Sequence, residues 1–64
     1  MKWRDLTPEQ LRSVAADLFD DAHDDEVDRE FIINERGFDA VAAMKAVARR
    51  LQREAARRER KASA

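Results

Sequence analysis

Apolar residues recur at three- and four-residue steps in the first third of the chain. The spacing covers six residues: Leu11, Val14, Ala15, Leu18, Phe19 and Ala22. Such spacing is typical of an α-helix with one apolar side. The segment Thr7-Pro8-Glu9-Gln10 precedes it, and it suits a helix start because Thr7 and Gln10 can form a capping box around Pro8. The pattern predicts a first helix over about residues 8–22.

The apolar side changes direction after this helix. At about 100° per residue, Leu18 and Val27 would lie about 180° apart on one continuous helix. The residues between them are rich in Asp, which favours caps and turns. We therefore expect a break near residues 22–25, with Asp24 or Asp25 capping a second helix over about residues 25–36. Gly37 then stands at the left-handed position that commonly follows a helix end.

The run Phe31-Ile32-Ile33 is apolar on every side of a helix, so it is either covered from several directions or forms a short strand. Both alternatives stay open from the sequence. A third helix is predicted over about residues 39–60, with Asp39 as its cap. Its buried side is made of Val41, Met44, Val47, Ala48, Leu51 and Ala55. No large apolar residue follows Ala56, so residues 57–64 are expected to fray.

These elements predict an all-α fold, a small three-helix unit with two shorter helices and a long, basic, amphipathic C-terminal helix. One glycine and one proline in 64 residues argue against a sheet, and the length allows a single domain over residues 1–64. A chain this short hides only about 60% of its unfolded surface, and no cysteine is present to reinforce it. We therefore expect a homodimer. The residues expected to mediate self-association are Phe31, Ile32, Val47 and Leu51.

Charge is divided between the two halves of the chain. Residues 1–36 hold 11 acidic and five basic side chains, whereas residues 37–64 hold three acidic and eight basic ones. The acidic lobe, a candidate partner-binding surface, consists of Asp17, Asp20, Asp21, Asp24, Asp25 and Asp28. The basic stripe, a second candidate surface, consists of Lys45, Arg49, Arg53, Arg57 and Arg60.

The position of the acidic lobe is unfavourable for stability alone. Aspartates near the C-terminal end of a helix are disfavoured by its dipole, and Asp is a poor interior helix former. Three explanations stay open: pairing with the basic helix of the same or a second copy, docking on a basic partner, or imitation of a nucleic-acid phosphate pattern. The basic stripe is either a solvated helix face or a surface that binds anions.

The sequence contains no recognisable catalytic or metal-binding set of residues. His23 and Glu26 are three residues apart, but a single histidine in an acidic turn matches no established metal site, and an exposed histidine is the simpler interpretation. The chain has no cysteine, tyrosine or glycine-rich loop, and Ser13 and Ser63 lie at no helical spacing from His23. We therefore expect no enzyme activity, cofactor, metal or small-molecule substrate.

The sequence also argues against a membrane-spanning segment and against a helix-turn-helix that reads duplex DNA. No run approaches the ~20 apolar residues that span a bilayer, and the first residues lack a secretion signal, so we expect a cytoplasmic protein that does not bind membranes. A helix-turn-helix interpretation fails because the third helix begins with Asp39 and small apolar residues, without a base-reading side chain before Lys45.

The sequence thus favours a non-enzymatic regulatory or adaptor protein that acts by protein–protein interaction through charged helical faces, as a homodimer. One alternative is a nucleic-acid-associated protein that uses the basic stripe. Another is an inhibitor whose acidic lobe occupies a basic nucleic-acid-binding groove of a second protein.

Overall fold

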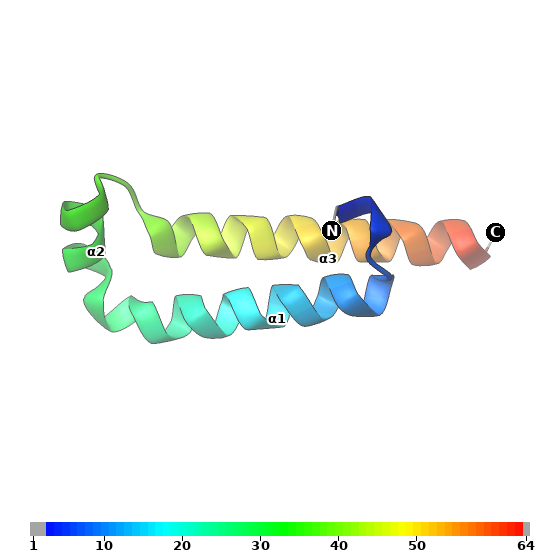
Figure 1. Cartoon of the computed structure of the whole chain (residues 1–64), viewed down its shortest axis with the longest axis horizontal. Helices are drawn as coiled ribbons and strands as arrows, with labels where there is room; N and C mark the ends of the chain where they lie inside the picture. Colours follow the sequence, from blue (N-terminus) through cyan, green and yellow to red (C-terminus); the bar gives the residue numbers. More distant parts are fainter. Residues whose placement is uncertain (1–2, 64) are drawn as a thin grey trace.

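The computed structural model describes residues 3–63, which form a rod of 46 × 18 × 17 Å. Its elements are η1 (Trp3–Asp5, a 3-10 helix), α1 (Pro8–Asp25), η2 (Glu26–Asp28, also 3-10), α2 (Arg29–Arg36) and α3 (Ala40–Ser63). Figure 1 shows α1 and α3 lying side by side and antiparallel, with α2 across one end of the rod. The fold is all-helical, and two helices precede a long C-terminal helix, as predicted. The α1 and α3 helices form a hairpin, and the short α2 lies across its end.

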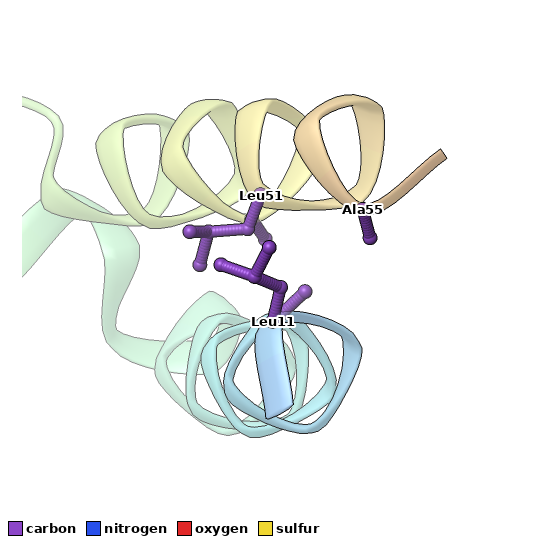
Figure 2. Packing of buried hydrophobic residues seen from close by; sticks show 5 residues of the cluster. Leu11, Leu51 and Ala55 are labelled. Carbon is purple, nitrogen blue, oxygen red and sulfur yellow. The ribbon is translucent and has the colours of Figure 1, made fainter. Parts of the chain in front are cut away.

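The core is a narrow seam between α1 and α3. Its buried cluster consists of Leu11, Ala15, Ala48, Leu51 and Ala55, and Leu6, Leu18 and Phe19 pack against it. Figure 2 shows Leu11 and Leu51 pointing toward one another across the seam. Ala15 and Ala22 are seven residues apart, as are Ala48 and Ala55, and such a spacing keeps small residues on one side of each helix. Alanines at these positions let the two helices lie close together.

Local chemistry explains where the helices begin and end. The Thr7 hydroxyl accepts a hydrogen bond from the Gln10 backbone N–H, and the Thr7 N–H donates to the Gln10 amide oxygen, which confirms the predicted capping box. Asp39 accepts from the Ala42 backbone N–H at 3.0 Å, so it caps α3. Gly37 adopts φ 80°, the left-handed conformation expected after α2.

The break between the first two helices differs from the prediction. The α1 helix continues to Asp25, and η2 joins it to α2. Neither Asp25 nor Asp28 caps with its side chain. The Asp25 backbone is right-handed helical (φ −79°, ψ −10°), whereas a capping residue adopts an extended conformation, so the predicted cap at Asp24 or Asp25 is wrong. The strand alternative for residues 31–33 is also wrong, because these residues belong to α2.

The last helix is longer than predicted. It runs to Ser63, past the expected end near residue 60. Residues 57–63 are helical where fraying was expected, and Arg58 is held by hydrogen bonds to the carbonyl oxygens of Leu6 and Trp3. Polar anchoring therefore replaces the missing apolar contacts. Ala64 lies outside the described residues.

Several apolar residues lie outside the core. Among residues 3–63, six large apolar side chains are exposed: Trp3, Val14, Val27, Phe31, Phe38 and Val47. Val14 and Val47 were expected on the apolar sides of the first and third helices. No residue of α2 is fully buried, although Ile32 and Ile33 are half-buried, because nothing in the described chain covers the outer sides of this helix. The Trp3 carbonyl oxygen accepts a hydrogen bond from Arg58 of α3, and the Trp3 side chain stays half exposed.

Candidate functional site

The acidic lobe is largely exposed to solvent. Asp25 is half-buried and the other five aspartates are exposed. Within residues 3–63, none of the six carboxylates accepts a hydrogen bond or forms an ion pair. Asp17, Asp20, Asp21 and Asp24 fall within an arc of about 100° on α1, at about 100° per residue. Like charges three or four residues apart each cost roughly 0.2–0.5 kcal/mol, so this arrangement opposes the helix that holds it.

The basic stripe is partly paired. Lys45 lies 3.7 Å from Glu26, and Arg57 lies 2.6 Å from Glu54 of its own helix. Arg49, Arg53 and Arg60 are exposed and have no ion-pair partner in the part of the chain that the structure describes. No residue of the acidic lobe pairs with a residue of the basic stripe among residues 3–63.

The antiparallel hairpin places the two charges at opposite ends of the rod. Residues 17–45 form the end that carries α2, the acidic end, with ten acidic and three basic side chains. Residues 3–16 and 46–63 form the other end, the basic end, with nine basic and four acidic side chains. The net charges of −7 and +5 are therefore separated along a rod 46 Å long.

An ion-pair network holds α2 against α3 at the acidic end. The Arg29 guanidinium donates to both carboxylate oxygens of Asp39, the shorter contact being 2.6 Å, and also to Glu26 at 3.2 Å. The hydrogen bond from Arg29, followed by that from the Ala42 N–H, lowers the pKa of Asp39 below its ordinary value. Charge pairing thus positions α2, which has no apolar core of its own.

A second ion-pair network lies at the basic end. Glu54 accepts hydrogen bonds from Arg57 and Arg58, which lower its pKa to about 2. Arg12 of α1 pairs with Glu59 of α3. Sequence reasoning missed the anchoring role of Arg58, although Arg58 follows Met44 and Leu51 at seven-residue steps, the signal that its stem faces α1.

The structure separates the four residues predicted to self-associate. Leu51 is only 3% exposed and belongs to the core of its own chain, so it cannot serve an interface, and this assignment is wrong. Ile32 is half-buried. Phe31 and Val47 are 66% and 37% exposed and remain accessible, but Phe31 lies in α2 and Val47 in α3.

The acidic end also carries exposed apolar side chains. Val27 is 91% exposed, and Phe31 and Phe38 are more than half exposed. All three lie in or next to η2 and α2, among the acidic residues of that end. Apolar side chains rimmed by charge are typical of protein–protein contact surfaces.

The described residues form no metal site, pocket or membrane-spanning helix. No three histidine or acidic side chains of residues 3–63 come close enough to hold a metal ion, and no pocket lies among them. His23 is exposed. In the same range, no helix combines the length and apolar character that crossing a membrane requires.

Comparison of the chain with protein-family models, with curated proteins and with solved structures returns no match in any of the three.

Proposed function

We propose that this chain is a non-enzymatic regulatory or adaptor protein that binds a basic protein partner through its acidic end and acts as a homodimer. The acidic lobe supplies charge for steering and orientation. Val27, Phe31 and Phe38 supply apolar area that a partner can bury. The chain itself contributes no catalytic group to this role.

One observation carries the proposal: six carboxylates at one end have no partner within residues 3–63, although their spacing opposes helix stability. If the charges existed to stabilise the fold, the hairpin would pair the acidic lobe with basic residues of α3. Instead Lys45 pairs with Glu26, outside the lobe, and Arg57 pairs within α3. A binding role accounts for charges that the fold itself leaves unused.

The test is capture of partners from the native host with the tagged chain, followed by mass spectrometry. The variant Asp20→Asn, Asp21→Asn, Asp24→Asn and Asp25→Asn keeps the side-chain shapes and removes four charges. We expect it to lose the captured protein while its circular dichroism stays helical. Glu9→Gln with Asp5→Asn is the matched control, because it removes acids outside the lobe.

The outcome of this capture decides the proposal. Retention of the same partner by the four-asparagine variant would show that the acidic lobe is not the binding surface. If the captured protein is one that binds nucleic acid, and added nucleic acid displaces the chain from it, the adaptor is an inhibitor that occupies a basic groove. Capture that disappears after nuclease treatment would favour the basic stripe instead.

A second candidate function rests on the basic stripe. Arg49, Arg53 and Arg60 are exposed and unpaired in the described chain, and together with Lys45 they extend over about 22 Å of α3 at about 1.5 Å per residue. A nucleic-acid-associated protein of this kind would be retained on DNA or heparin and released by salt. Replacing the three arginines by alanine should then reduce the slope of log K against log salt by about 3. Absence of retention at low salt would exclude this function.

A further inference from the structure

One face of the hairpin carries exposed apolar residues near the middle of the rod. Val14 and Val47 each precede a fully buried alanine of the seam, Ala15 in α1 and Ala48 in α3. One residue turns a helix by about 100°, and in an antiparallel pair an equal turn moves both side chains toward the same face. Val14 and Val47 therefore share one face, on which they are 41% and 37% exposed.

The ion pairs agree with this geometry. Arg12 and Glu59 pair across the hairpin, and each directly follows a residue that faces the opposite helix, Leu11 and Arg58. Because Arg12 and Glu59 follow these residues, whereas Val14 and Val47 precede theirs, the helix turn places Arg12 and Glu59 on the face opposite to the two valines. Val47 lies seven residues from the start of α3, about 11 Å at about 1.5 Å per residue. Because α2 extends the rod beyond the start of α3, Val47 lies close to the middle of the 46 Å rod.

The molecule exposes more surface than a compact chain of its mass. Its accessible area is 5010 Å², whereas a compact monomer of 7.4 kDa exposes about 4,200 Å². Its radius of gyration is 14.0 Å, against about 11 Å for a compact domain of 64 residues. Two copies packed into one compact body would expose about 7,000 Å². Dimerisation would then hide about 3,000 Å² in total, an area typical of permanent homodimers.

We propose that the face holding Val14 and Val47 binds a second copy of this chain, antiparallel to the first, to form a four-helix bundle. This inference deepens the homodimer named in the proposed function and specifies its surface and orientation. The two-fold axis crosses the rod near Val14 and Val47, so the same residues meet from both copies.

Charge selects the antiparallel orientation. A parallel dimer would place two ends of net charge −7 beside one another and two ends of +5 beside one another. An antiparallel dimer places each acidic end beside the basic end of the other copy. The aspartates of α1 and Arg49, Arg53 and Arg60 of α3, which have no ion-pair partner among residues 3–63, then lie in the field of opposite charges.

The first test is the mass in solution. Light scattering coupled to gel filtration should give about twice 7.4 kDa at micromolar concentration. Val14→Ser with Val47→Ser should raise the dimer dissociation constant about tenfold or more, while the far-ultraviolet circular dichroism of the concentrated protein stays helical. Val27→Ser is the matched control, since Val27 is a 91% exposed valine in η2, away from the helix seam.

The second test is orientation, measured on the unmodified interface. The chain has no cysteine, so Glu35→Cys introduces one unique site for a spin label at the exposed surface of the acidic end. In the antiparallel dimer the two labels should be separated on the order of the rod length, 46 Å, rather than its 18 Å width. Raising the salt concentration should weaken the antiparallel dimer and would strengthen a parallel one.

Each outcome decides the inference. The inference is overturned if the wild-type chain stays monomeric at concentrations 100-fold above the micromolar range. It is also overturned if Val14→Ser with Val47→Ser leaves the dimer dissociation constant unchanged, or if the Glu35→Cys labels lie a short distance apart. Because capture of a basic partner by the acidic lobe is measured separately, a monomer would leave that part of the proposed function standing. Loss of partner capture would likewise leave the antiparallel dimer intact.

Discussion

Leu11 is the side chain whose removal should destabilise the hairpin most clearly. It is fully buried, and it points toward Leu51 across the seam between α1 and α3. Leu11→Ala removes three carbons, which costs about 2.4 kcal/mol at about 0.8 kcal/mol per methylene. The cavity left behind raises the cost to about 3–5 kcal/mol. A domain of 64 residues has only about 3–10 kcal/mol of stability, so this single change should remove a large share of it.

The assay is urea unfolding followed by circular dichroism at 222 nm, with every protein at the same concentration because dimerisation contributes to the apparent stability. Val27→Ala is the control, since the Val27 side chain is 91% exposed and its loss should change the free energy of unfolding by less than about 0.5 kcal/mol. If Leu11→Ala and Val27→Ala shifted the urea midpoint equally, the Leu11–Leu51 seam would not be the core, and α1 and α3 would not pack as this hairpin.

Three further changes test the local structure. Gly37→Ala forces an L side chain into φ 80° and should cost about 1–2 kcal/mol in urea unfolding, although open space surrounds the new Cβ; an unchanged midpoint would contradict the left-handed turn. Thr7→Ala removes the cap of α1 and should cost about 1 kcal/mol in the same assay, whereas Ser13→Ala on an exposed helix surface should not. The Glu54 pKa is depressed to about 2 from an ordinary 4.5, so its contribution is complete above pH 4.5 and is lost as the pH falls toward about 2. The stability difference between the wild-type chain and Glu54→Gln should therefore shrink over that interval, and a difference independent of pH would refute the network with Arg57 and Arg58.

Helix capping was predictable because it depends on neighbours in the sequence. Thr7 with Gln10, Asp39 with Ala42, and the left-handed Gly37 all involve residues at most four positions apart. The failed cap at Asp25 illustrates the limit of this reasoning. An aspartate in the right place caps only if its backbone leaves the helical conformation, and Asp25 stays right-handed helical where η2 begins.

Burial was less predictable because periodicity gives the direction of a side chain and says nothing about what stands opposite. Leu51 and Val47 belong to the same apolar stripe of α3, yet Leu51 is 3% exposed and Val47 is 37% exposed. A single opposing helix covers only the centre of a stripe, so residues at its edge stay exposed. The same reason leaves α2 without a buried residue.

The two candidate charged surfaces were also predictable only in part. The segregation of charge was evident from the order of the residues, but its geometry was not. Whether Asp20 and Arg53 neutralise one another depends on where the hairpin turns, and no sequence pattern sets that distance.

The sequence alone determined the helical periodicity, the caps and the division into acidic and basic halves, because each follows from residue type and local spacing. Only the tertiary structure decided that α1 and α3 run antiparallel and carry the charges to opposite ends of a rod. The physical reason is that a two-helix seam of alanines and leucines buries one side of each helix. It leaves the acidic lobe, most of the basic stripe and the face of Val14 and Val47 in contact with solvent.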